Sequence, residues 1–465
     1  MEPKVIKISH ISPATDPPRD SVDPLILPLT FLDLRWVRSY PSQQVIFYKL
    51  PELSHEFFHS VLLPKLERSL SLALGHYIPL AGHLTWNEQD PKPRVLVFGH
   101  DTVKLTVAES NADFFLVSGK GLRLQSELRV LVPKLSISCD SASLYALQIT
   151  LFPNQGFCIG LAEHHVLKDG TGSIMFIKAW AHICKSLEDG AMTLPSLPKE
   201  FTPIIDRTLI NVRPSFESKI LESLSYFSDE KDGKRTMKPP PVGENSTDLV
   251  RITLELTQEK VEKLKEHAMR ESTRTQPDLH LSTFVIINAY VWSCLVKARG
   301  VDEERPLRFM YAADCRNRLD IPKRYLGNCV VLINCFGYKT DKLMGRNGFS
   351  NAVEILSDSV KGLGSQGTEE LLESYIDGMK LVQPETHVES VSGSNRLGFY
   401  RADFGWGKPV NHELVSIDQY PAYSMWERRD ETGGAEIGLC LKKSEMNSFI
   451  SFFKHGLETI ESQSV

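Results

Sequence analysis

The feature that most constrains the fold lies between residues 145 and 184. In residues 145–151, large apolar side chains alternate with Ala, Gln and Thr, which is the period-two pattern of a half-buried strand. The turn sequence Pro153-Asn154-Gln155-Gly156 follows, and a second alternating segment covers residues 157–161. Residues 174–184 are apolar on nearly every side, which predicts a buried helix. A strand hairpin next to a buried helix predicts a core built from both kinds of element.

The chain length and one change of composition predict the domain organisation. Because 465 residues exceed what one hydrophobic core usually organises, we predict two domains. Residues 196–247 are rich in Pro and charge, with a charged run at 229–235 and a Pro triplet at 239–241, which predicts an exposed linker. We therefore expect one domain over residues 1–195 and another over 248–465. Strands and helices do not alternate strictly in either, so the fold class is α+β.

Helical periodicity and one strand pattern supply the other expected elements. Apolar side chains recur at helical spacing in residues 57–74, before Pro79. Residues 249–254 resemble a strand, and Thr257 is placed to cap the helix that follows. We expect a helix from Ser282 to about Lys297. The last expected helix carries one apolar stripe, made by Met446, Phe449, Ile450, Phe453 and Leu457.

Charge and cysteine usage exclude several classes of protein. The formal net charge of −5 gives no reason to expect nucleic acid or an anionic membrane as a partner. The first residues do not resemble a secretory signal, and no apolar run has the roughly 18 residues of a membrane span. The eight cysteines are scattered without a C-x-x-C pair, so we expect reduced, mostly buried thiols. These features favour the cytosol.

The stretch Glu-His-His-Val-Leu-Lys-Asp-Gly-Thr-Gly at residues 163–172 stands between the second strand and the buried helix. Two imidazoles and a carboxylate are possible metal ligands, but adjacent residues of an extended chain point in different directions, and no further ligand stands at a helpful spacing. An inert polar loop is disfavoured because each buried polar group without a partner costs roughly 1–3 kcal/mol. A neutral imidazole acting as a general base fits the residues better. No G-x-S-x-G motif and no convincing cysteine nucleophile accompany it, which favours direct attack by a second substrate.

Two motifs in this chain resemble those of a known family. His164-His165-Val166-Leu167-Lys168-Asp169-Gly170 matches the HHxxxDG motif of CoA-dependent acyltransferases and of peptide-synthetase condensation domains. Asp403-Phe404-Gly405-Trp406-Gly407 matches the DFGWG motif of the plant BAHD acyltransferases. The resemblance extends to residues 66–82, 206–208 and 313–316. Tyr325-Leu326-Gly327-Asn328-Cys329 resembles an element of the branch that acylates flavonoid and other phenolic glycosides, except that Leu326 replaces Phe.

The resemblance implies a fold and a set of roles for the motif residues. It implies two similar-sized mixed-sheet domains of the chloramphenicol-acetyltransferase type, joined by a long crossover linker, with the active-site channel between them. His165 and Asp169 are the expected catalytic pair: His165 removes the acceptor proton, and Asp169 turns away from the channel to pair with Arg316. Asp403, Phe404, Gly405, Trp406 and Gly407 are expected to shape a supporting loop. The implied protein is a monomer that needs acyl-CoA as co-substrate and neither a metal nor a permanently bound cofactor.

Residues that contact CoA are harder to locate, because the sequence has no phosphate-binding loop. Ser282 and Thr283 at a helix start, and Ser392 and Ser394 around a glycine, are candidates, since amides at turns and helix N-termini favour phosphate. Ordinary caps and turns explain these four residues equally well.

The branch resemblance implies malonyl-CoA as the donor and a sugar hydroxyl of a flavonoid, anthocyanin or other phenolic glucoside as the acceptor. A hydroxycinnamoyl-CoA donor with the same acceptors is an alternative. A malonyl carboxylate needs a positive or hydrogen-bonding partner, yet residues 170–173 after the motif carry no cation. Lys168 is a possible substitute, although a solvated surface lysine is the plainer expectation. A condensation enzyme served by a carrier protein and a non-catalytic binding protein are the remaining alternatives.

Overall fold

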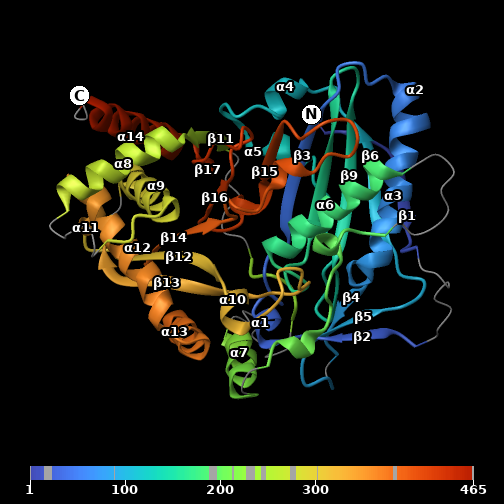
Figure 1. Cartoon of the computed structure of the whole chain (residues 1–465), viewed down its shortest axis with the longest axis horizontal. Coiled ribbons are helices and arrows are strands. Elements are labelled where there is room, and N and C mark those ends of the chain that lie inside the picture. Colours follow the sequence, from blue (N-terminus) through green and yellow to red (C-terminus); the bar gives the residue numbers. More distant parts are fainter. Residues whose placement is uncertain are drawn as a thin grey trace.

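The computed structural model describes residues 2–14, 23–87, 89–187, 196–211, 214–226, 236–241, 248–272, 279–300, 302–380 and 385–462. In this part of the chain the strands form two large sheets and one small sheet. Figure 1 shows the larger sheets in two bodies, with the N-terminal half on the right and the C-terminal half on the left. The predicted two-domain α+β fold is confirmed. The predicted boundaries at 195 and 247 and the charged run at 229–235 lie outside the described residues.

The sheet of the N-terminal half contains the predicted hairpin. In the order in which they pair, its described strands are β1 (Lys4–Ile11), β6 (Val103–Glu109), β9 (Tyr145–Phe152), β10 (Gly156–Glu163), β3 (Ser42–Lys49) and β15 (Asn411–Leu414). β9 and β10 pair antiparallel, and all their residues are buried. The prediction of a half-buried strand at 145–151 was wrong because apolar side chains cover both faces of the sheet.

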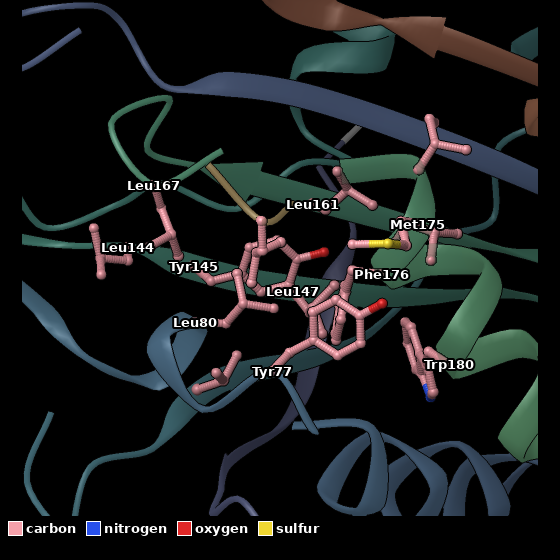
Figure 2. Close-up of a cluster of buried hydrophobic side chains, with 14 of the residues drawn as sticks. Tyr77, Leu80, Leu144, Tyr145, Leu147, Leu161, Leu167, Met175, Phe176 and Trp180 are labelled. Carbon is pink, nitrogen blue, oxygen red and sulfur yellow. The ribbon is translucent and has the colours of Figure 1, made fainter. Parts of the chain in front are cut away.

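Two long helices cover one face of this sheet. They are α3 (Leu63–His76) and α6 (Gly170–Ser186). Figure 2 shows Phe176 of α6 among Tyr77, Tyr145 and Leu147, with Trp180 beside them. The rings of Tyr77 and Tyr145 both meet Phe176 edge on, at centroid distances of 5.1 and 5.4 Å. The predicted helix over 57–74 is divided into α2 (His55–Phe57), the π-helix η1 (Phe58–Leu62) and α3.

The other large sheet belongs to the C-terminal half. In the order in which they pair, its strands among the described residues are β13 (Val330–Lys339), β12 (Pro306–Asp314), β14 (His387–Ser392), β16 (Tyr423–Trp426), β17 (Ala435–Lys442), β11 (Leu249–Leu256) and β7 (Arg123–Leu124). Its helices gather on the outer side in Figure 1: α8 (Gln258–Glu271), α9 (Thr283–Arg299), α11 (Asp341–Met344), α12 (Gly348–Ser365) and α14 (Lys443–Ser462). Thr257 caps α8 as predicted, since its hydroxyl accepts from the backbone N–H of Lys260 at 3.3 Å. The predicted helices at 282–297 and at the C-terminal end are confirmed as α9 and α14.

The small sheet and the remaining α-helices complete the strands and α-helices of the described residues. The sheet has the order β2 (Leu25–Pro28), β5 (Arg94–Val97), β4 (His83–Thr85) and β8 (Ser141–Ser143). The shorter helices are α1 (Phe31–Leu34), α4 (Phe114–Val117), α5 (Gln125–Arg129) and α10 (Arg316–Leu319), and two longer ones are α7 (Pro214–Tyr226) and α13 (Thr368–Lys380). No helix among the described residues is long and apolar enough to cross a membrane.

The two halves exchange strands. β15, from the C-terminal half, pairs with β3, and β7, from the N-terminal half, pairs with β11. Glu413 of β15 forms buried ion pairs with Arg123 of β7 and with Arg251 of β11. These two cations lower the pKa of the Glu413 carboxyl to about 2, although burial alone would raise it. The exchange therefore ties the two halves together through backbone pairing and a buried charge cluster.

The described parts of residues 196–247 differ from the exposed linker that the composition predicts. They include helix α7, in which Phe216 and Ile220 are buried. Arg207 is also buried and contacts the segment around residue 167. Because Phe216 and Ile220 pack into the core of the N-terminal half, the described parts of this segment are not exposed throughout.

Candidate active site

The predicted motif lies where β10 passes into α6. From Gly156 to Asp169 every residue is buried except His165, which is partly exposed. Asp169 is the N-cap of α6, and its Oδ1 accepts from the backbone N–H of Gly172 at 3.2 Å. The buried strand and the capped helix therefore fix the short loop between them and leave His165 facing outward.

His165 faces a large cavity between the two halves. The cavity has a volume of about 1860 Å³. It is lined from the N-terminal half by residues that include Trp36, Tyr40 and His165, and from the C-terminal half by residues that include Tyr311 and Trp426. A site of this kind can hold two substrates whose reacting groups meet at one imidazole.

The ring of His165 is held on two sides. Its plane stacks on the indole of Trp36, with centroids 3.6 Å apart and an interplanar angle of 15°. Its Nδ1 lies 3.1 Å from Oδ1 of Asn328. Burial lowers the pKa of His165 most strongly; Glu163, Asp169 and a hydrogen bond to the backbone of His165 itself partly offset this, and Arg35 adds a smaller lowering. A lowered pKa favours the neutral ring near pH 7, which is the form that a general base requires.

His164 points away from the cavity. It is buried, and its Nδ1 accepts from the backbone N–H of Val166 at 3.3 Å. Burial, helped by the neighbouring His165, lowers the pKa of His164 to about 4. The two adjacent histidines thus occupy different environments, and among the described residues no three His, Cys, Asp or Glu side chains gather as metal ligands would.

Asp169 connects the two halves instead of contacting the imidazole. Its carboxylate binds Arg316 through two contacts, at 2.9 Å from Nη1 and 3.0 Å from Nη2, and both side chains are buried. Its Oδ2 also accepts from the backbone N–H of Cys329 at 3.0 Å. The ion pair that the resemblance implies is present. No hydrogen bond joins Asp169 to the ring of His165 among the described contacts.

Lys168, inside the motif, is neither on the surface nor directed at the cavity. Its side chain is 1% exposed and forms an ion pair with Glu163, which also accepts from the hydroxyl of Ser173 at 3.0 Å. Both expectations for Lys168, a solvated lysine and a partner for a malonyl carboxylate, were wrong. The neighbouring carboxylate of Glu163 neutralises the ammonium group and makes its burial tolerable.

The DFGWG segment forms a tight loop against α6. The carboxylate of Asp403 accepts from the backbone N–H groups of Gly405 and Gly407 at 2.9 and 3.0 Å, and binds Lys185 of α6 at 2.5 Å. Both glycines have positive φ, 107° and 102°, which other residues rarely adopt. Phe404 is fully buried and meets Trp180 edge on at 4.8 Å, whereas Trp406 is only partly buried. Phe404 is thus the main apolar anchor of this loop.

The four candidate CoA-contacting residues separate into two pairs. Ser392 and Ser394 line the cavity. Ser282 and Thr283 are not among its lining residues, and the hydroxyl of Ser282 caps α9 by accepting from the N–H of Val285 at 3.3 Å. The structure therefore keeps Ser392 and Ser394 next to the site and gives Ser282 an ordinary capping contact.

Several residues around His165 were not singled out from the sequence. Trp36 carries no local signal that would have identified it. Asn328 and Arg207 stand inside segments that resemble the family, but their contacts could not be inferred from position alone. Arg207 donates to the carbonyl oxygens of Leu167 and Leu326, at 2.9 and 2.5 Å. It thereby joins the loop of the motif to the segment before β13.

A family model described as the Transferase family matches residues 4–455. Three relatives from Arabidopsis thaliana resemble nearly the whole chain. A BAHD acyltransferase is 54% identical, covering 97% of each chain. Agmatine coumaroyltransferase is 51% identical, over 97% of this chain and 98% of the relative. Phenolic glucoside malonyltransferase 2 is 45% identical, over 98% and 99%.

The fold also resembles that of a solved enzyme structure. The crystal structure of vinorine synthase superimposes with a TM-score of 0.68 at 19% sequence identity, covering 96% of each chain. This likeness supports the two-domain architecture, and the matched family model and the relatives above cover the same length of sequence. The chain belongs to the BAHD family of acyltransferases.

Proposed function

We propose that this acyltransferase uses His165 as the general base for direct transfer of an acyl group from acyl-CoA. The observation that carries the proposal is the setting of His165: its imidazole is held by Asn328 and Trp36 and is partly exposed to a cavity between two domains. The imidazole takes the proton of the acceptor while the oxygen or nitrogen of the acceptor attacks the thioester carbonyl. The tetrahedral intermediate then expels the CoA thiolate, which receives the proton from the imidazolium. Binding both substrates in one cavity makes the attack effectively unimolecular.

The proposed donor is malonyl-CoA. Eleven Lys and Arg side chains but only five carboxylates line the cavity, in a chain whose formal net charge is −5. A local excess of positive charge suits the phosphates of CoA and a malonyl carboxylate. Arg35 lies against the ring that stacks on His165, with its Cζ 4.2 Å from the centroid of Trp36. We propose Arg35 as the partner of the malonyl carboxylate in place of Lys168.

The proposed acceptor is a sugar hydroxyl of a phenolic glucoside, flavonoid and anthocyanin glucosides included. Aromatic side chains line the cavity, among them Trp36, Tyr40, Phe284, Tyr311 and Trp426. Rings of this kind favour a flat phenolic aglycone by stacking and apolar burial. The name of the 45% identical relative, phenolic glucoside malonyltransferase 2, agrees with this acceptor class and with the malonyl donor.

A second candidate is transfer of a hydroxycinnamoyl group, with an amine or a phenolic glycoside as acceptor. Agmatine coumaroyltransferase is 51% identical to this chain. Thr171, which follows the motif and lines the cavity, provides no cation for a malonyl carboxylate. The aromatic lining described above suits a hydroxycinnamoyl ring equally well.

We also propose that the enzyme works as a monomer in the cytosol. The cavity with His165 is lined by residues of one chain from both of its halves. All eight cysteines are unpaired thiols, and seven of them are buried, which suits a reducing compartment.

A competition between donors tests the assignment. Purified enzyme receives equal malonyl-CoA and p-coumaroyl-CoA, first with a flavonoid glucoside and then with agmatine, and kcat/KM is compared for the four pairs. We expect malonyl transfer to the glucoside to be the fastest reaction. A preference for coumaroyl beyond tenfold, about 1.4 kcal/mol of transition-state binding, would remove the malonyl assignment and establish the second candidate. If His165→Ala retained full activity with every pair, the proposed role of the base would be wrong.

A further inference from the structure

We propose that Asn328 is a positioning residue that holds His165 in the one neutral tautomer able to accept a proton at Nε2. This inference rests on the proposed function, because it assumes that His165 is the base. Asn328 lies just before β13, in the C-terminal half, and is fully buried. Its contact with His165 spans 163 residues of sequence.

The orientation of the Asn328 amide follows from its surroundings. Its Nδ2 lies 2.9 Å from Oδ1 of Asp33, 2.9 Å from the carbonyl oxygen of His165 and 3.2 Å from that of Val166. All three neighbours are acceptors only, so they require the donating end of the amide. If the amide were turned over, its oxygen would face a carboxylate and two carbonyls.

The fixed amide determines where the proton of His165 lies. Oδ1 of Asn328 has to be the acceptor in the 3.1 Å contact with Nδ1 of His165, so Nδ1 carries the hydrogen. In a neutral imidazole the other nitrogen, Nε2, then carries the lone pair. His165 lines the cavity and Nδ1 is occupied, so Nε2 is the ring nitrogen left for the acceptor proton.

Asp33 and Arg207 keep Asn328 in this orientation. Asp33 is fully buried, and its Oδ1 also accepts from the backbone N–H of Asn328 at 3.1 Å. Its Oδ2 accepts from the backbone N–H and the hydroxyl of Thr30, at 2.9 and 2.8 Å. Nε of Arg207 lies 3.6 Å from the same oxygen. The carboxylate is thus fixed from several sides and holds the amide rather than the imidazole.

The arrangement differs in one physical respect from a His that pairs directly with a carboxylate. A carboxylate orients the ring and also stabilises the imidazolium. Here a neutral amide stands between Asp33 and the ring, so the orientation is kept without a charge in contact with Nδ1. In a serine protease, replacing that carboxylate by an amide imposes the wrong tautomer and lowers kcat about 10⁴-fold.

The decisive measurement is the ¹⁵N spectrum of the enzyme labelled with ¹⁵N-histidine, near pH 7.5, where the neutral ring predominates. The spectrum of His165→Ala identifies the two ring nitrogens of His165 by their loss. We expect a protonated Nδ1 and an unprotonated Nε2 in the wild-type enzyme, and a mixture of tautomers in Asn328→Ala. We also expect kcat of Asn328→Ala to fall roughly 10- to 100-fold, less than in His165→Ala, with KM values within about threefold. A protonated Nε2 in the wild-type enzyme would overturn the proposal.

Asn288→Ala is the matched control. Asn288 of α9 is equally buried, and its amide bonds to Phe284 and Tyr423 instead of the motif. We expect it to lower thermal stability while leaving the His165 tautomer unchanged. If both alanine variants lost the same activity, or if folded Asn328→Ala kept wild-type kcat while His165→Ala lost activity, Asn328 would have no positioning role. If His165→Ala itself kept activity, the proposed function would fail first.

Discussion

Asp169 and Arg316 stand 147 residues apart in sequence, yet their side chains form a buried ion pair through two contacts. The pair joins the N-cap of α6, within the HHxxxDG motif, to the first residue of α10 in the other half. Because the same carboxylate also caps α6 and binds the backbone of Cys329, one side chain fixes three parts of the site.

Removing Asp169 should therefore act mainly on folding. We expect Asp169→Ala to lower the free energy of unfolding by about 3–5 kcal/mol, because Arg316 is left buried without its partner. Urea unfolding of Asp169→Ala, of Arg316→Met and of the double variant gives the coupling energy between the two side chains. A fully stable Asp169→Ala enzyme without activity would instead assign Asp169 to the chemistry.

The two adjacent histidines should separate stability from activity. His165→Ala is expected to fold normally and to lose roughly 10²–10⁴ in kcat, the contribution of a general base. His164→Ala removes a buried ring from the core, so its thermal stability should fall and its kcat should change less. Thermal melts and steady-state kinetics of both variants test this. Equal losses of activity in two well-folded variants would contradict the choice of His165.

Alanine substitutions in the DFGWG loop should lower stability in proportion to how deeply the replaced side chain is buried. Phe404→Ala is expected to cost about 3–5 kcal/mol of stability, as for other large buried aromatic residues. Trp406→Ala should lower thermal stability by less, with a parallel loss of activity, because its ring is already partly exposed. Denaturant unfolding ranks the two variants. If Trp406→Ala kept full stability and lost all activity, the supporting role of this loop would be wrong.

The pH dependence of kcat/KM should show a base that stays neutral in weak acid. Burial lowers the pKa of His165, Glu163 and Asp169 partly offset this effect, and Arg35 adds a smaller lowering. Since activity requires the neutral ring, kcat/KM should be constant near pH 7 and should fall only below the ordinary imidazole value of about 6.5. A pH series at saturating acceptor measures the midpoint. A midpoint above 6.5 would mean that the nearby carboxylates raise the pKa of His165 by more than burial lowers it.

Arg35 should determine the preference for a charged donor. Losing a charge-assisted hydrogen bond of about 1.5–3 kcal/mol predicts that Arg35→Leu loses roughly 10- to 100-fold in kcat/KM with malonyl-CoA. Acetyl-CoA, which has no carboxylate, should be used about equally by both enzymes, and Arg35→Lys should keep part of the malonyl activity. An equal loss with both donors would place Arg35 in general support of Trp36 instead.

Local patterns were sufficient for much of this architecture. The alternation in residues 145–161 and the apolar segment at 174–184 predicted the hairpin and helix that carry the motif, because strand and helix periodicity depends on near neighbours. Thr257 and Ser282 were recognisable as cap residues for the same reason, since a cap bonds to a backbone group three residues away. The residue types at 163–170 favoured a general base over a metal site or an inert loop.

Tertiary structure alone decided the surroundings of His165. The sequence predicts that Lys168 is a surface residue, but its side chain is buried and forms an ion pair with Glu163. Trp36, Asn328 and Arg316 reach the motif from segments more than 100 residues away, and β15 and β7 each join the sheet of the other half. Periodicity within a segment does not specify such contacts, because they depend on how segments far apart in the sequence pack together in the fold. The sequence therefore identified His165 as the candidate base, and the fold determined its orientation, the burial that lowers its pKa, and its partners.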